Sequence, residues 1–244
     1  MGPLDLSRLE SDIIACRRCS RLVRYREKVA EEKVARHAGE SYWGRPVPGF
    51  GLPDARMWIL GLAPAAHGGN RTGRVFTGDR SGDFLFQSLY EAGFCNQPTS
   101  ISASDGLKVY DLFISAVVRC APPDNRPTKE EFSACQPFLE REFLALDSLR
   151  LVLALGHVAY RQYQSMTASL FPELSIRVPP FSHGRLIDAP SPHHPAILCA
   201  YHPSARNTQT GLLTFSMMQE VLLQAKSYLK GNTRFDPLEG KVRV

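Results

Sequence analysis

Four short apolar segments constrain the fold of this chain more than any other feature of its sequence. Segments with a helical pattern separate them, at about 81–92, 128–149 and 157–170. Buried strands that alternate with helices are typical of parallel sheets, because a helix usually makes the crossing between parallel neighbours. The sequence therefore predicts an α/β fold in which helices cover both faces of a mostly parallel sheet. The expected strands are residues 56–62, 109–118, 151–155 and 196–201.

One domain accounts for most of the 244 residues. The apolar fraction of 43% supplies one sizeable core, and the length is near the upper limit for a single core. We expect the domain to span residues 1–230, with a first helix from about Leu4 to Arg36 and a last helix from about Gln209 to Leu229. Residues 231–244 are expected to form a flexible tail.

The bulk composition excludes only a few classes of protein. No run approaches the roughly 20 apolar residues that a membrane-spanning helix needs, and the first ten residues are too polar for a signal peptide. We therefore expect a cytoplasmic protein without a membrane anchor. The net charge of +5 suits a polyanionic partner but also suits many ordinary proteins, so it decides nothing by itself.

Four of the six cysteines stand in an arrangement that suggests a metal site. Cys16 and Cys19 form a C-x2-C pair within the expected first helix, while Cys120 follows a strand and Cys135 lies in the next helix. In a reducing compartment such thiols are more often metal ligands or buried apolar residues than disulfides. Sulfur ligands select zinc or an iron-sulfur cluster, and the spacing leaves both open.

Two polar loops begin where expected strands end, which is where open parallel sheets bind their ligands. The first, residues 61–79, reads GLAPAAHGGNRTGRVFTGD and lacks the glycine spacing of the common nucleotide-binding loops. Phe76 is a large ring among its polar residues. The second, residues 202–211, reads HPSARNTQTG and opens a helix. A lone histidine such as His202 is more often a hydrogen-bonded structural residue than a catalyst.

Both loops, the segment RCAPPDNRPT at 119–128 and the four cysteines together resemble the family 5 uracil-DNA glycosylases over nearly the whole chain. Long motifs in the correct order are a much stronger signal than one short pattern. The resemblance implies a three-layer α/β/α fold with a central four-stranded parallel sheet. It also implies a four-iron four-sulfur (4Fe-4S) cluster, whose ligands would be Cys16, Cys19, Cys120 and Cys135.

Two differences separate this chain from the related family 4 enzymes. Family 4 carries a Glu or an Asp near the front of its first motif, where this chain has Leu62 and Ala63. It also carries an Asn where this chain has Ala116. Both differences match family 5, so the resemblance does not imply strict selectivity for uracil.

The resemblance further implies a DNA-repair glycosylase that acts on double-stranded and single-stranded DNA containing uracil or other deaminated bases. Such an enzyme rotates the nucleotide out of the stack and hydrolyses its N-glycosidic bond, which leaves an abasic site. Phe76 is expected to stack on the extruded base, although it could instead only fill the core. Asp79 is expected to stabilise the cationic sugar and to position or deprotonate water, and His202 to donate a hydrogen bond to the leaving base. Neither loop contains a lysine, so we expect hydrolysis without strand cleavage.

Other motif residues complete the expected site. Asn125 and Asn207 are expected to contact the base edge or to orient water, although each could instead form a turn or cap a helix. The remaining candidates for binding the substrate are Ala63, His67 and Ser204. The candidates for binding the DNA backbone are Arg71, Arg74 and Arg206.

Two other functions are compatible with part of the pattern. A non-enzymatic nucleic-acid-binding protein with a structural zinc would account for the charge and the cysteines. A small iron-sulfur electron carrier would account for the cysteines, but it would not need Phe76, Asp79 and His202 in ordered loops. A glycosylase that acts as a monomer at the nucleoid is therefore the preferred interpretation.

Overall fold

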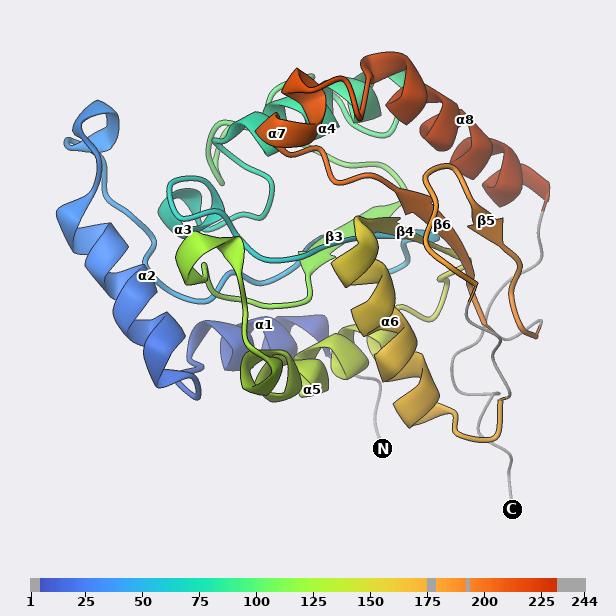
Figure 1. Ribbon diagram of the computed structural model, residues 1–244, viewed down its shortest axis with the longest axis horizontal. Coiled ribbons are helices and arrows are strands. Elements are labelled where there is room, and N and C mark those ends of the chain that lie inside the picture. The colour runs from blue at the N-terminus through green and yellow to red at the C-terminus, as the bar shows by residue number, and fades with distance from the viewer. Residues whose placement is uncertain (1–4, 175–178, 192–193, 232–244) are drawn as a thin grey trace.

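The computed structural model describes residues 5–174, 179–191 and 194–231, and its centre is a six-stranded sheet in the order β1-β3-β2-β4-β6-β5 (Figure 1). The four inner strands are parallel, which confirms the predicted sheet. They are β3 (Leu112–Ala116), β2 (Met57–Gly61), β4 (Leu151–Leu155) and β6 (Ala196–Ala200). The antiparallel edge strands β1 (Phe50–Gly51) and β5 (Leu186–Ile187) were not predicted, because two residues carry no periodicity.

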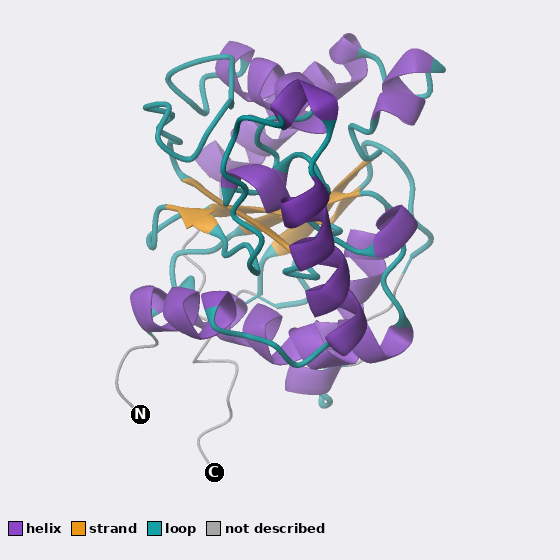
Figure 2. Ribbon diagram, turned by 90° about the vertical axis from the view of Figure 1, so that its left-hand side faces the viewer, coloured by secondary structure: helices purple, strands orange, loops and turns teal. Residues whose placement is uncertain are grey.

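Helices form a layer on each side of the sheet, as Figure 2 shows from the side. One layer consists of α4 (Arg80–Glu91) and α8 (Phe215–Gly231), which pack against each other. The opposite layer contains α5 (Lys129–Ala145) and α6 (His157–Leu170), with α1 (Leu6–Ile14) packed against α5. The three-layer α/β/α arrangement implied by the sequence is therefore confirmed.

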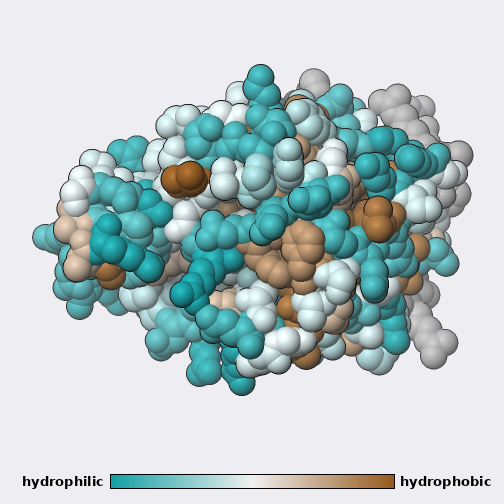
Figure 3. Space-filling model, turned by 90° about the horizontal axis from the view of Figure 1, so that it is seen from above, coloured by the Kyte–Doolittle hydropathy of each residue, from teal (hydrophilic) through white to brown (hydrophobic). Residues whose placement is uncertain are grey.

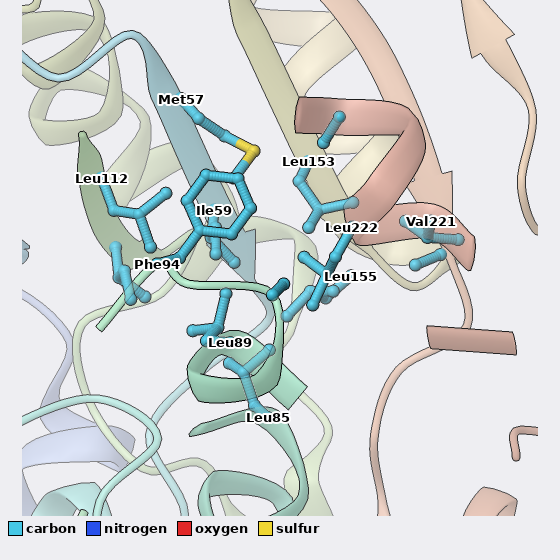
Figure 4. Packing of buried hydrophobic residues seen from close by; sticks show 14 of the residues in the cluster. Met57, Ile59, Leu85, Leu89, Phe94, Leu112, Leu153, Leu155, Val221 and Leu222 are labelled. Carbon is cyan, nitrogen blue, oxygen red and sulfur yellow. The ribbon is translucent and has the colours of Figure 1, made fainter. Parts of the chain in front are cut away.

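Successive side chains of a strand point to opposite faces of the sheet, so the core has one part under each helix layer. Met57 and Ile59 of β2 face α4 and α8, where they belong to one cluster with Leu89 (Figure 4). Trp58 and Leu60 belong to the cluster on the opposite face, which includes side chains of α5 and α6. Both faces of β2 are fully buried, as an all-apolar strand in a parallel sheet requires.

The expected single helix from Leu4 to Arg36 is wrong. Two helices, α1 and α2 (Ser20–Glu32), run in different directions, and the short 3-10 helix η1 (Ala35–His37) follows them (Figure 1). Cys16 and Cys19 therefore lie in the connection between helices rather than inside one. Burial of Leu9 and Ile13 of α1 against Phe138 of α5 fixes the direction of α1, a tertiary contact that local helical propensity does not encode.

The expected last helix from Gln209 is also divided. A short helix α7 (Ala205–Gln209) ends before Gly211, whose φ of +73° is a common way to stop a helix, and α8 begins only at Phe215. Residues 232–244, which contain nearly all of the expected tail, lie outside the described part of the chain. No helix among the described residues is long and apolar enough to cross a membrane.

A buried polar network ties the end of β3 to α5. The Arg119 guanidinium donates to both carboxylate oxygens of Glu142 at 2.8 and 2.6 Å, and both side chains are only 1% exposed. Ser115 donates to Glu142 at 2.8 Å and accepts from the Trp58 indole at 2.9 Å. The network fixes the position of the segment that begins with Arg119 and continues into Cys120.

We expect Glu142→Ala to lower the free energy of unfolding by about 3–5 kcal/mol, because it leaves the Arg119 charge buried without its partner. Urea unfolding of the variant measures this. Asp12→Ala is the matched control. It removes the partly exposed ion-pair partner of Arg141, which lies next to Glu142 on α5, and should cost less than about 1 kcal/mol. Equal losses in the two variants would contradict the assignment.

Candidate functional site

A cavity of about 740 Å³ opens at the carboxyl ends of the parallel strands. Its walls come from the segments that follow β2, β3 and β6, and from η1. The expected site residues among its lining are Ala63, Phe76, Asp79, Asn125, His202, Ser204 and Arg206. Segments up to 170 residues apart in sequence, from Arg36 to Arg206, thus meet at one edge of the sheet, as open α/β sheets require of their ligand sites.

Asp79 caps the helix that follows the first loop. It is the N-cap of α4, and its Oδ1 accepts a hydrogen bond from the Gly82 backbone N–H at 3.0 Å. Burial raises the pKa of the Asp79 carboxyl above its ordinary value, while hydrogen bonds from the backbone of Gly82 and Ser81 oppose that rise. The site therefore holds a carboxylate in a poorly hydrated place, where its charge acts strongly on anything bound nearby.

His202 belongs to the segment that follows β6, and its ring lies beside that of Phe76, which belongs to the loop that follows β2. The centroids of the two rings are 6.0 Å apart. Burial lowers the pKa of His202 to about 4, so the imidazole is neutral near pH 7 and carries one N–H that can donate. Asn207 donates from its side-chain amide to the His202 carbonyl at 2.8 Å and so helps to position it.

Phe76 occupies an unusual backbone conformation, with a φ of +52°. A large residue with positive φ is a local source of strain, and such strain is concentrated at functional sites. The ring packs on Gly61, the last residue of β2, where an added Cβ would come within 2.6 Å of the Phe76 Cζ. The surrounding loop thus places an aromatic face at the end of the strand.

Asn125 approaches the cavity from the segment after β3. It belongs to the short 3-10 helix η2 (Pro123–Asn125), and both Asp124 and Asn125 have positive φ, at 54° and 55°. Its side chain is exposed to the cavity. Asn207 and His67 do not line the cavity: Asn207 lies behind His202, and the His67 ring instead contacts the Tyr42 hydroxyl at 3.1 Å.

Arg71 and Arg74 do not face solvent, although the sequence suggested contacts with the DNA backbone. They are 8% and 7% exposed. Arg71 forms an ion pair with Glu40, and Arg74 forms one with Asp105 at 2.8 Å. Their guanidinium groups are occupied inside the protein: Arg71 also donates to the backbone carbonyls of His67 and Gly78, and Arg74 to the hydroxyls of Thr77 and Ser100.

Exposed cations at the cavity come instead from three other arginines. Arg36, Arg80 and Arg206 line the cavity, and within the described chain none of them forms a side-chain ion pair or hydrogen bond. Arg36 and the neighbouring His37 were missed as site residues, because η1 reaches the cavity only by tertiary folding, and Arg80, the first residue of α4, was missed as well. Seen from above, the molecule presents a mostly hydrophilic face with hydrophobic side chains in separate patches (Figure 3).

The four cysteines of the expected metal site gather near one another. Burial is the largest cause that raises the pKa of Cys19, Cys120 and Cys135, and it brings that of Cys120 to about 12. The charge of Cys16 also raises the pKa of all three thiols. Arg26, 2% exposed, donates to the Cys120 Sγ at 2.9 Å. Among residues 5–174, 179–191 and 194–231, no group of three or more His, Cys, Asp or Glu side chains is arranged to hold a single metal ion.

Comparisons with known proteins agree with this geometry. The family model described as "Uracil DNA glycosylase superfamily" matches residues 48–226. A type-5 uracil-DNA glycosylase of Thermus thermophilus is 46% identical over 91% of this chain and 98% of its own length. One of Mycobacterium leprae is 45% identical over 92% of this chain and 96% of its own. A type-4 uracil-DNA glycosylase of Sulfurisphaera tokodaii is 26% identical over 92% and 88%.

We expect Asp79→Asn to raise the stability of the protein near pH 8, because it removes a buried charge while the Asn oxygen still accepts from Gly82. The folded-state pKa of Asp79 lies above its unfolded value, so the penalty is complete above the folded pKa and disappears at acidic pH. Denaturant midpoints at pH 8 and pH 4 test this. Asp79→Ala loses the cap and should be about 0.5–2 kcal/mol less stable than Asp79→Asn. A gain for Asp79→Asn that is independent of pH would contradict the explanation.

Proposed function

This chain belongs to the uracil-DNA glycosylase superfamily and to its type-5 branch, and we propose that it is a DNA-repair enzyme that excises uracil and other deaminated bases. One observation supports this most directly. A half-buried carboxylate, Asp79, and a neutral imidazole, His202, line the same cavity as the Phe76 ring. That set of groups fits the hydrolysis of an N-glycosidic bond.

The cavity can receive a base only after it leaves the DNA stack. Rotating the nucleotide out costs a few kcal/mol, and least when the base is mispaired, as deaminated bases are. Stacking on Phe76 recovers about 1–3 kcal/mol of this cost. The exposed cations Arg36, Arg80 and Arg206 stand at the cavity where the phosphates of the flanking nucleotides would lie.

Cleavage of the bond creates positive charge on the sugar and negative charge on the base. We propose that Asp79 stabilises the cationic sugar and positions the attacking water. His202, being neutral, donates its one N–H to a base oxygen as that oxygen gains charge. The two groups thus act on the two opposite charges of the same transition state.

The walls beside the base are apolar and predict a broad substrate range. Leu62, Ala63 and Ala116 line the cavity and offer no polar side chain to read the base edge. Among the candidates named from the sequence, Asn125 remains to contact that edge. We therefore propose that hypoxanthine and xanthine are substrates as well as uracil, in double-stranded or single-stranded DNA.

We propose that the four cysteines hold a 4Fe-4S cluster. The charge of Cys16 acts on each of the other three thiols, so the four lie close enough together to bind one cofactor. Four cysteine thiolates are the ligand set of a 4Fe-4S cluster. The buried Arg26 guanidinium would offset its negative charge. Bound there, the cluster would cross-link the connection between α1 and α2 to α5.

A non-enzymatic nucleic-acid-binding protein is not favoured. Such a protein has no use for a desolvated carboxylate in a cavity, which costs stability. The monomeric state and the association with the nucleoid remain predictions, consistent with a site that a single chain completes.

The proposed function predicts different losses for the two central residues. Asp79→Ala should lower single-turnover excision of uracil by about 10²-fold or more, as loss of one preorganised electrostatic group does, while abasic-site DNA still binds. His202→Ala should lose more activity on uracil than on 5-fluorouracil, because a better leaving group needs less help. Equal losses on the two bases would remove the leaving-group role. Near-normal activity of Asp79→Ala would move the catalytic centre to Asn125 or a backbone-held water.

The proposed cluster predicts that Cys16→Ser and Cys120→Ser lose iron and visible absorption and unfold at lower temperature, since metal-binding free energy is also folding free energy. Cys95→Ser is the matched control, because Cys95 is buried but its Sγ contacts the Phe86 and Gln97 carbonyls rather than other thiols. Iron content and Tm measure both effects. Bound zinc instead of iron would replace the cluster assignment.

A further inference from the structure

Arg71 stands directly behind the proposed catalytic carboxylate. It belongs to the single-turn helix α3 (Gly69–Thr72) within the loop that follows β2. Its Nε donates to the His67 carbonyl at 2.8 Å, and one Nη donates to the Gly78 carbonyl at 3.0 Å. The other Nη donates to a Glu40 carboxylate oxygen at 2.5 Å. One guanidinium therefore connects both ends of the loop.

The two carbonyls held by Arg71 flank Asp79 from both sides. Gly78 precedes Asp79 in the chain, and His67 precedes Gly68, on which the Asp79 carboxylate packs. A Cβ added to Gly68 would come within 2.0 Å of the Asp79 Oδ2, and one added to Gly78 within 2.2 Å of an Arg71 Nη. Both glycines are thus required by close approach, and a small movement of either carbonyl would move the carboxylate.

We propose that Arg71 is a positioning residue for Asp79, which holds the catalytic carboxylate in place through the carbonyls of His67 and Gly78. This inference rests on the proposed function. It assigns Arg71 to the interior of the site and not to the DNA backbone. The fork of a guanidinium suits this role, because it reaches three acceptors in fixed directions, whereas a lysine ammonium is a single point charge.

The charge of Arg71 also acts on Asp79 and gives the proposal a second observable. Its field lowers the pKa of Asp79, against the larger and opposite effects of burial and of Asp83. The charged or titratable groups that face Asp79 or share its cavity are Arg71 from α3, Arg80 and Asp83 from α4, Arg36 and His37 from η1, and His202 and Arg206 from the segment after β6. Loss of the Arg71 charge should therefore move the pKa of Asp79 upward.

The test is single-turnover excision of uracil from pH 5 to pH 9 by Arg71→Gln and Arg71→Lys, with binding to abasic-site DNA measured alongside. We expect Arg71→Gln to lower the rate by about 10²-fold, as small misplacements of catalytic groups do, and to shift the acidic midpoint of the profile to higher pH. Arg71→Lys should keep the wild-type midpoint but not the wild-type rate. Binding to abasic-site DNA and its salt dependence should stay unchanged.

Arg56→Gln is the matched control, because Arg56 also pairs with a carboxylate, Asp111, and donates to a backbone carbonyl, that of Leu229. It lies at the opposite end of the sheet, so it should change stability without moving the pH midpoint. Glu40→Gln, which leaves both carbonyl contacts in place, provides a second variant if Arg71→Gln fails to fold. It should lower the rate less than 10²-fold.

Two results would overturn the proposal. An unchanged rate and midpoint in Arg71→Gln, or a Glu40→Gln rate as low as that of Asp79→Ala, would remove the positioning role. A salt slope lowered by about one, with the rate at saturation unchanged, would return Arg71 to the DNA backbone. If the wild-type protein excises no uracil, the proposed function itself fails. If the wild-type protein is active and the Arg71 variants are as active with the same midpoint, only this inference fails.

Discussion

Burial of the four parallel strands on both faces is the constraint on which the rest of this structure depends. Each inner strand is buried along its whole length and, apart from Ser115 of β3, apolar, so it is stable only between two layers of helices. Parallel strands also end at one edge, and the polar segments that leave them have to meet there. The carboxylate, the imidazole and the aromatic ring of the site come together because the sheet places them, and not because they are close in sequence.

Desolvation at that edge of the sheet lowers the stability of the fold, but it strengthens the electrostatic interactions that the proposed reaction needs. It raises the pKa of Asp79 and lowers that of His202, so each charged form is less stable than in water. In the same poorly hydrated space, a carboxylate interacts strongly with a cationic sugar. The helix cap at Asp79 and the internal ion pairs of Arg71 and Arg74 offset part of this cost, since they hold the loop where an unsupported one would open.

The arginines around the cavity and the cysteines divide into two groups that their sequence positions do not distinguish. Arg26, Arg71, Arg74 and Arg119 are buried and bind carbonyls, carboxylates or a thiol. Arg36, Arg80 and Arg206 are exposed around the cavity. A net positive charge therefore says less about contacts with DNA than the accessibility of each guanidinium does, because only an exposed cation can neutralise a phosphate.

The sequence alone determined the architecture of the centre and the loops that carry the site. Short, mostly apolar runs identified all four inner strands, and the polar loops after β2 and β6 contain Asp79, Phe76 and His202. Tertiary structure decided where the first helix breaks, which arginines face solvent, and that η1 brings Arg36 to the cavity. The burial of a strand and the chemistry of a loop depend on residues that are neighbours in the sequence, so local patterns predict them. The direction of α1 and the partners of Arg71 depend instead on contacts between segments far apart in the chain.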